Sequence, residues 1–255
     1  MKPPNVAGWL VVAVVVGVGE AAVRLFDLHD SVAAPSAAFG ALVAGLASGE
    51  LSGEIGTTLE SYAEGLALAV AAGVVLGVVI GSSRVLQDAS FVVIEFLRPI
   101  PAVALIPLAI LFLGLGVPMR RFVIAYAAVW PILINTLYGV RGSDRLLHDV
   151  ATTSGVSSAG RLVRVALPAA LPSIATGIRV SASIALLVGV TAEFLSPGTG
   201  GIGSYMHQQQ LAFQLPELYG AVVLVGILGY AINVALGAAE RHVVFWVGEA
   251  RTGAR

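Results

Sequence analysis

Residues 62–82 read YAEGLALAVAAGVVLGVVIGS, and Glu64 is the only charged side chain in this stretch. A helix needs roughly 20 mostly apolar residues to cross the hydrocarbon core of a bilayer, and this stretch has that length. Five further stretches are similarly apolar, at residues 6–26, 91–113, 121–140, 173–195 and 218–239. The sequence therefore predicts an all-α, polytopic membrane protein with six transmembrane helices, in a single domain over residues 1–255.

The composition indicates the same class. Hydrophobic residues make up 57% of the chain and charged residues only 11%, with a mean hydropathy of +0.92. A soluble domain carries roughly 25% charged residues, so a chain this apolar cannot keep its surface soluble. The net charge of -1 leaves no basic surface for phosphate, which argues against nucleic acid as a partner.

Missing residue types exclude several functions. The chain has no cysteine, which excludes disulfides, zinc–thiolate sites, iron–sulfur clusters and thiol nucleophiles. Its only lysine is Lys2, so the Gly-Lys-Ser/Thr core of a phosphate-binding loop is absent. Whatever energises the protein therefore lies on another polypeptide or is an ion gradient. No pair of histidines has the spacing of metal ligands, so we expect no metal site.

Basic residues predict the orientation, because cytoplasmic loops of membrane proteins are rich in Lys and Arg. A cytoplasmic N-terminus puts most basic residues inside, namely Lys2, Arg84, Arg141, Arg145, Arg161, Arg164, Arg241, Arg251 and Arg255. The outside then receives Arg24, Arg120 and Arg121, with Asp27, Asp30, Glu50 and Glu54. We therefore expect both termini in the cytoplasm.

Three stretches between the predicted spans carry structure of their own. Residues 31–60 predict a polar external segment with one short helix at 36–47. Residues 203–213 predict another short external helix, which carries a solvated His207. Residues 143–172 predict a cytoplasmic loop of about 30 residues, far longer than the usual connection between neighbouring helices.

The cytoplasmic loop divides into two short helices. The first covers about 145–153 and ends at Gly155, where glycine suits a left-handed cap. Ser157 can cap the second, which runs to about 166, before Leu167. Ala151 and Gly155 are small enough to let a partner's backbone approach. This loop is either a rigid knob that transmits a push or an amphipathic connector at the membrane surface.

Asp149-Val150-Ala151, then Gly155, then Leu167-Pro168 resemble the EAA loop of ABC-importer permeases. The consensus of that loop is Glu-Ala-Ala, then Gly, then an apolar stretch that ends in Leu-Pro. Here Asp149 stands for the Glu and Val150 for the first Ala. The resemblance implies that the loop is the coupling helix that docks into a groove on an ATPase subunit. The coupling residues that it implies are Asp149, Val150, Ala151, Gly155, Arg161, Leu167 and Pro168.

Further motifs, in order along about residues 34–240, resemble the nitrate/sulfonate/taurine branch of these permeases. They include Ala34-Pro35-Ser36, Leu97-Arg98-Pro99-Ile100-Pro101, Trp130-Pro131-Ile132 and Ala192-Glu193-Phe194. The resemblance implies the type I importer permease fold, a homodimer in a bacterial cytoplasmic membrane, a solute-binding protein outside and two ATPase subunits inside. ATP and Mg would lie on the ATPase, so this chain would be a transport subunit with no cofactor. Members of the branch carry small oxyanions, sulfonates and bicarbonate, and others carry thiamine-precursor pyrimidines or aromatic acids.

The third predicted span contains Pro99, Pro101 and Pro107 and should be kinked or partly broken. Backbone carbonyls freed in hydrocarbon are costly, so the break should face the bundle interior or a water path. Arg98 lies beside it. Arg98 either snorkels to the cytoplasmic interface or lines the pathway and offers its guanidinium to a passing anion.

Three other features of the spans bear on transport. Glu193 closes the fifth span before a glycine run that reads as a flexible external turn, and it serves either in gating or in pairing, for example with a partner permease. We expect Asn135 to bond between helices rather than to touch substrate. Glycines repeat every four residues in the second span, at Gly73, Gly77 and Gly81, and predict close helix packing within the subunit or at a dimer interface.

Two other functions predict different sequence features from those of an importer subunit. An ion-driven secondary transporter predicts inverted repeats and paired acidic residues at mid-membrane, and the sequence shows neither convincingly. An intramembrane hydrolase needs a nucleophile and a base at membrane depth. The histidines all fall outside the predicted spans, at His29, His148, His207 and His242.

Overall fold

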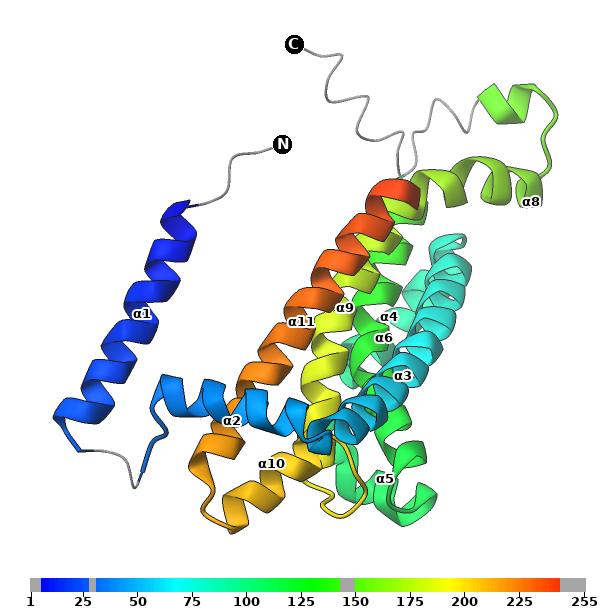
Figure 1. The fold of residues 1–255 in the computed structure, drawn as a ribbon. Helices are drawn as coiled ribbons and strands as arrows, with labels where there is room; N and C mark the ends of the chain where they lie inside the picture. The colour runs from blue at the N-terminus through cyan, green and yellow to red at the C-terminus, as the bar shows by residue number, and fades with distance from the viewer. Residues whose placement is uncertain (1–5, 28–30, 143–149, 244–255) are drawn as a thin grey trace. The chain divides into compact units, whose positions relative to one another are not determined.

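The computed structural model describes residues 6–27, 31–142 and 150–243, and every element within these ranges is helical (Figure 1). Residues 150–153 form the end of one helix. The other elements, of which η1 is a 3-10 helix and η2 a π-helix, are α1 (Val6–Leu25), α2 (Pro35–Ala47), α3 (Glu50–Gly81), α4 (Arg84–Leu97), η1 (Ala102–Leu105), α5 (Ile106–Leu113), α6 (Val117–Arg141), α8 (Ser158–Arg161), η2 (Leu162–Ala166), α9 (Leu167–Phe194), α10 (Ile202–Leu211) and α11 (Leu215–Val243).

Four helices within the described ranges are long and apolar enough to cross a membrane. They are α3, α6, the continuous helix Leu162–Phe194 and α11 over Leu215–His242. The pair Arg84–Leu97 and Ala102–Leu113 bends by 80° and is a fifth if it counts as one span. All five lie at predicted spans, and α1 covers the remaining one with 20 residues. The all-α membrane class is confirmed.

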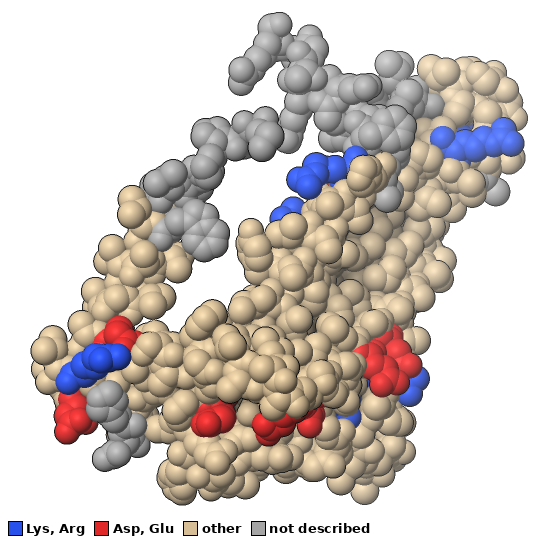
Figure 2. All heavy atoms as spheres, in the orientation of Figure 1, with Lys and Arg blue, Asp and Glu red and all other residues tan. Residues whose placement is uncertain are grey.

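The surface agrees with that class. On the face shown in Figure 2, uncharged residues cover most of the surface of the described helices. Large apolar side chains are exposed along α1, α4 and α11, among them Val15, Val92 and Tyr230, each more than half accessible. Such a surface is stable in contact with lipid and unstable in water.

The prediction of residues 31–60 is right at its start and wrong at its end. The short helix expected at 36–47 is confirmed as α2, with Pro35 at its first position, where its missing N–H costs nothing. Residues 50–60, however, are the first turns of the 32-residue helix α3. Leu51 and Thr58 are buried and Ile55 is half-buried, a helical spacing. This amphipathic pattern outweighs the polar composition of the segment.

The predicted end of the second loop helix is also wrong. The second loop helix does not stop before Leu167, because α8, η2 and α9 follow one another without a break. Pro168 has no N–H to donate within this continuous helix. The N–H of Leu167 instead reaches back to the Leu162 carbonyl, so the turn before the proline widens to π geometry. The helix therefore continues through a sequence that resembles a helix end.

The chain divides into two compact units. Unit 1 comprises Met1–Thr58 and Glu193–Leu228, and unit 2 comprises Leu59–Ala192 and Gly229–Arg255. In unit 1, helices α2, α3, α10 and α11 share a buried apolar cluster of Leu42, Leu51, Ile202, Tyr205, Ala221 and Leu224. This cluster connects the two short helices to the ends of two long ones.

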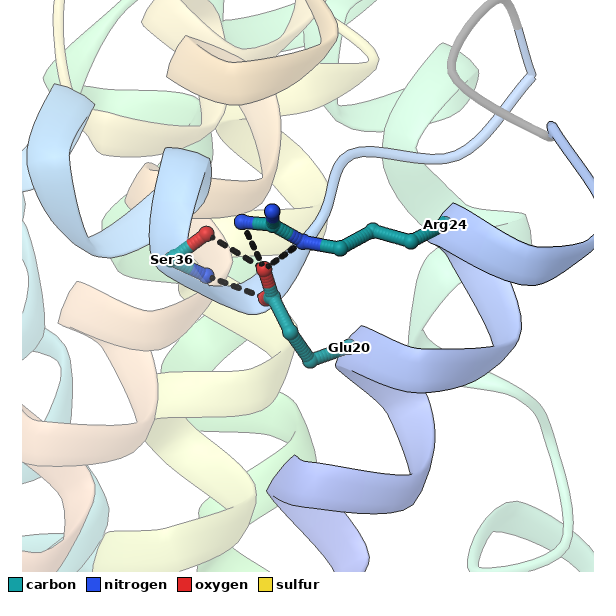
Figure 3. A network of polar contacts seen from close by, with 3 residues as sticks. All are labelled: Glu20, Arg24 and Ser36. Carbon is teal, nitrogen blue, oxygen red and sulfur yellow. Dashed lines mark hydrogen bonds and ion pairs between the residues drawn. The ribbon is translucent and has the colours of Figure 1, made fainter.

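A carboxylate joins α1 to α2 within unit 1 (Figure 3). Glu20 accepts hydrogen bonds from the backbone N–H of Ser36, at 3.0 Å, and from its hydroxyl, at 2.8 Å. Arg24, one turn further along α1, forms an ion pair with the same carboxylate at 2.6 Å. The N-cap residue of α2, Ala34, provides no side-chain acceptor. Glu20 therefore caps α2 from the neighbouring helix.

Unit 2 is built on close packing of α3 against α6. A Cβ added at Gly73 would lie 2.8 Å from Ile132, and one added at Gly77 would lie 2.6 Å from Thr136. At Gly81 the nearest side chain is Val140, at 3.2 Å. The predicted glycine face is confirmed, and it packs within the subunit.

Replacing Gly77 with alanine should destabilise the protein, although alanine favours a helix. The new Cβ would meet both Thr136 and, at 2.8 Å, the carbonyl oxygen of Leu133. Overpacking of this kind costs about 1–3 kcal/mol. We expect Gly77→Ala to lower the thermal unfolding midpoint in detergent. Gly226→Ala is the matched control, because nothing lies within 4 Å of a Cβ there; equal midpoints for the two variants would contradict the packing argument.

Candidate translocation and coupling sites

The third span is broken at its prolines, as predicted. Helix α4 ends at Leu97, and η1 begins at Ala102 after Pro99 and Pro101. The segments on either side meet at 80°. Arg98 is the C-cap of α4: its N–H donates to the Ile94 carbonyl at 2.9 Å, and its side chain is exposed. The bend thus presents a guanidinium at the surface of unit 2.

A residue that sequence analysis missed holds this bend. Pro101 cannot donate an N–H to the Leu97 carbonyl one turn before it. The hydroxyl of Tyr126, on α6, donates to that carbonyl at 2.6 Å. The Tyr126 ring stands edge-on to Trp130, with centroids 5.6 Å apart, and stacks on Phe122 at 6.5 Å. The sequence did contain a signal for such a contact. Pro101 follows Leu97 by four residues in a predicted span, so the Leu97 carbonyl loses its usual helical donor and needs one from another helix.

Glu193, at the end of α9, is fully buried. Its carboxylate accepts a hydrogen bond from the Thr58 hydroxyl at 2.9 Å and from the N–H of Gly203 at 3.0 Å. The Thr58 oxygen in turn accepts the N–H of Ile202 at 2.8 Å. Two side chains therefore satisfy the first N–H groups of α10, where a carboxylate is also favoured by the helix dipole.

Glycine is required where the chain enters α10. Gly201 has φ +100°, and a Cβ there would lie 2.3 Å from the carboxyl carbon of Glu193. Its N–H donates to the Glu54 carboxylate of α3. The glycine run was predicted as a flexible turn, but its last residue before α10, Gly201, is held by its contacts with Glu193 and Glu54. We name the set of Glu54, Thr58, Glu193, Gly201 and Gly203 the α10 latch.

The latch lies beside an acidic part of unit 1. Burial raises the pKa of Tyr205, on α10, and the carboxylates of Glu50, Glu217 and Glu54 raise it further. His207, also on α10, is not the solvated side chain that we predicted. Its ring is half-buried and stands edge-on to Phe194, with centroids 5.2 Å apart. Within the described ranges, no three His, Cys, Asp or Glu side chains form a metal site.

Asn135 lies where α6 meets α9. Its amide Nδ2 donates to the carbonyl of Pro131 at 2.8 Å. Opposite it is Gly177, where an added Cβ would come within 2.9 Å of the Asn135 Cβ. Asn135 therefore packs in a tight contact between α6 and α9, but its hydrogen bond stays within α6, so the expected bond between helices is wrong.

A polar cluster on α9 and α11 did not emerge from the sequence. Arg179 donates from Nε to Asn233 Oδ1 at 2.7 Å and pairs with Glu240 at 3.7 Å. Arg179 lies within the predicted span 173–195. Its partners come from a different helix, so local spacing does not indicate them. At the start of α6, Arg121 pairs with Glu64 at 3.3 Å, and Arg120 is buried.

The described part of the loop at residues 143–172 has the predicted caps. Gly155 has φ +73°; its N–H donates to the Thr152 carbonyl at 3.0 Å, and the Val156 N–H donates to the Ala151 carbonyl at 2.9 Å. These two bonds form a Schellman motif, which ends the helix in a defined direction. Ser157 caps α8, accepting the Gly160 N–H at 3.2 Å.

The other coupling residues that the resemblance implies differ in their exposure and in the helix that carries them. Val150 is exposed and Ala151 is half-buried. Arg161 donates to the Val156 carbonyl at 3.2 Å, so it braces the turn. Leu167 and Pro168 lie in the first turn of α9. Asp149 and the rest of the first predicted loop helix, residues 145–148, lie outside the described residues, as do both termini.

Comparison with known proteins gave a family match and several relatives. The family model described as binding-protein-dependent transport system inner membrane component matches residues 69–248. A putative ABC transporter permease of Methanocaldococcus jannaschii is 34% identical over 65% of this chain and 62% of its own length. A putative aliphatic sulfonates transport permease of Escherichia coli K12 is 35% identical, over 60% and 58%. A nitrate import permease of Synechocystis is 32% identical, over 64% and 59%. The chain thus matches about three fifths of each relative.

A solved structure shares the fold. A chain from the inward-facing MetNI methionine ABC transporter superimposes with a TM-score of 0.61 at 19% identity. The match covers 76% of this chain and 94% of the other.

Proposed function

Because this chain belongs to the family of binding-protein-dependent transport system inner membrane components, we propose that it is the membrane-spanning permease of an ATP-driven importer. It is a transport component rather than an enzyme. The observation that carries the proposal is the capped two-helix turn at residues 150–166, which lies inside the matched range. ATP and Mg would act on a separate ATPase subunit.

The coupling role is assigned to the loop around Gly155. The Schellman motif and the Ser157 cap define the direction of both short helices, so a force on one is passed to the other. Val150 and Val163 are exposed apolar side chains, at 55% and 61%. Exposed apolar groups on a rigid turn suit a groove on a protein partner. Asp149 through Pro168 is the proposed ATPase contact.

The proposed topology has six spans in one permease domain, with α1 as the first and both termini in the cytoplasm. The exposed apolar surface of α1 supports a position in lipid. The external side then receives the acidic part of unit 1, with Glu50, Glu54 and Glu217. Of the two arginines that this orientation puts outside at the start of α6, Arg121 is paired with Glu64 and Arg120 is buried.

The proposed assembly is a homodimer that receives its solute from an external binding protein. Arg98 at the bend of the third span is the proposed cation of the pathway, with Pro99 and Pro101 shaping it. Asn135, in the tight contact of α6 with α9, and Glu193, buried in the α10 latch, are proposed to support the helices around the pathway rather than to line it. A guanidinium suits small oxyanions, because its planar donors match sulfonate or nitrate oxygens. The proposed solute is a sulfonate-, taurine- or nitrate-like anion; a pyrimidine or aromatic acid is the alternative.

The coupling proposal predicts loss of ATPase binding in Ala151→Trp. The indole would occupy the space that a partner's backbone needs beside Ala151. We expect at least about a tenfold loss of ATPase co-purified from the inner membrane, because a bulky side chain at the centre of an interface costs more than 1.4 kcal/mol. Gln208→Trp is the control, because Gln208 is exposed on α10. Failure of the unmodified chain to bind any ATPase subunit from its own membrane would refute the importer role.

The topology predicts that the loop is reached only from inside. The chain has no cysteine, so Ser154→Cys, at an exposed position, provides a single reporter. We expect a membrane-impermeant maleimide to leave it unlabelled in intact spheroplasts and to label it after lysis. Gln208→Cys should show labelling in both. Labelling of Ser154→Cys in intact cells would place the loop outside and exclude ATPase docking.

A further inference from the structure

The peptide unit between Leu97 and Arg98 is held from two sides. Its N–H, that of Arg98, donates to the Ile94 carbonyl at 2.9 Å within α4. Its carbonyl, that of Leu97, accepts the Tyr126 hydroxyl at 2.6 Å from α6. A peptide unit is planar, so two bonds at opposite ends fix the direction in which the chain leaves it. The 80° bend of the span lies directly after this peptide unit, between Leu97 and Ala102.

The prolines alone do not fix this direction. Pro99 and Pro101 remove donors and open the helix, but an opened helix can bend by different amounts. Within the break, the Ile100 N–H donates to the Leu97 carbonyl at 3.1 Å, and the Ala104 N–H donates to the Pro101 carbonyl at 3.0 Å, where η1 begins. The Tyr126 hydroxyl, on α6, supplies a second hydrogen bond to the Leu97 carbonyl. This bond comes from a different helix of unit 2, so it ties the bend to α6.

The Tyr126 ring is itself held in place. Trp130 meets it edge-on at 84°, and Phe122 stacks on it at 29°, so α6 carries three aromatic rings one turn apart. Aromatic pairs in these geometries are stabilising beyond their buried area. The hydroxyl therefore has a defined position before it meets Leu97.

We propose that Tyr126 is a positioning residue: its hydroxyl sets the angle of the third span and thereby the place of Arg98 in the pathway. That Arg98 lies in a transport pathway rests on the proposed function. The effect of the Tyr126 hydroxyl on the bend is measured without any transport assay. In this role Tyr126 acts through the Leu97–Arg98 peptide rather than on the solute.

The test measures the bend directly in the full-length protein in liposomes. Val92→Cys and Leu108→Cys place spin labels on exposed positions on either side of the bend, in a chain with no other cysteine. Pulsed electron resonance then reports the label-to-label distance. In Tyr126→Phe the ring stack remains and only the hydroxyl is lost. We expect the distance distribution to broaden toward the spacing of a straight helix, about 1.5 Å per residue, with about a tenfold larger population away from the native distance.

Two comparisons make the result decisive. Tyr138→Phe, on the exposed face of the same helix, should leave the distribution unchanged. Pro101→Ala restores an N–H that can reach Leu97, so Tyr126→Phe should change the distance less in that background than in the native one. A distribution in Tyr126→Phe equal to that of Tyr138→Phe overturns the proposal. A merely structural role would lower the unfolding midpoint without changing the distance in folded molecules. Loss of ATPase binding or of transport would bear on the proposed function and leave this result intact.

Discussion

Glu193→Ala should give the largest loss of stability among single changes in unit 1. The carboxylate is fully buried and accepts from the Thr58 hydroxyl and the Gly203 N–H. Removing it leaves two buried donors, each of which costs about 1–3 kcal/mol without an acceptor. The expected result is a clearly lower unfolding midpoint in detergent, together with faster proteolysis between α9 and α10.

Variants of Thr58 isolate one bond of the α10 latch. Thr58→Val removes the hydroxyl that links Glu193 to the N–H of Ile202 and should cost less than Glu193→Ala. Thr58→Ser keeps the hydroxyl and should retain most of the stability. If Glu193→Ala unfolds at the same temperature as Thr58→Ser, the latch does not hold α10. If these variants behave as expected, the Glu193 carboxylate is paired within the subunit, and its burial is explained without a gating role.

Arg98→Ala should give the largest loss of transport that leaves the fold intact. The side chain is exposed at the bend, so its removal breaks no buried contact of the described residues. If the guanidinium binds the passing anion, its loss removes a charge-assisted hydrogen bond of about 1.5–3 kcal/mol. Uptake of labelled taurine or nitrate into proteoliposomes that contain the whole importer should then need about 10- to 100-fold more substrate for half-maximal rate.

Two other arginine variants test whether charge at this position matters. Arg98→Lys should recover part of the uptake, because it keeps the charge but not the planar pair of donors. Arg84→Ala removes an exposed charge from the other end of α4 and should leave uptake unchanged. A fall in transport after Arg98→Ala that only matches a fall in assembled importer would return Arg98 to an interfacial anchor.

Several structural features were predictable because their causes are local. The lengths of the apolar runs indicated which segments form long helices, and the prolines indicated the break before η1. Gly155 and Ser157 identified both caps of the turn at residues 150–166, because a left-handed glycine and a serine N-cap act within a few residues of themselves. The glycine repeat of α3 indicated a close-packed face, although not its partner, α6.

The two helix boundaries that were predicted wrongly followed local signals, and tertiary packing or local backbone adjustment outweighed those signals. Polar residues at the start of α3 and prolines at the start of α9 are common at helix ends, yet both helices extend through them. In α3 the burial of Leu51 and Thr58 on one face stabilises the extra turns. In α9 the π turn before Pro168 removes the conflict between the proline and the helix.

What the sequence determined by itself is the class of protein and the position of its helices, because apolar length, prolines and glycine caps act on neighbouring residues. Only the tertiary structure decided which groups meet. The Tyr126 hydroxyl and the Leu97 carbonyl are 29 positions apart, and Thr58 and Glu193 are 135 apart. No periodicity connects residues at such separations; they meet because buried polar groups must find partners on whichever helix the packing brings beside them.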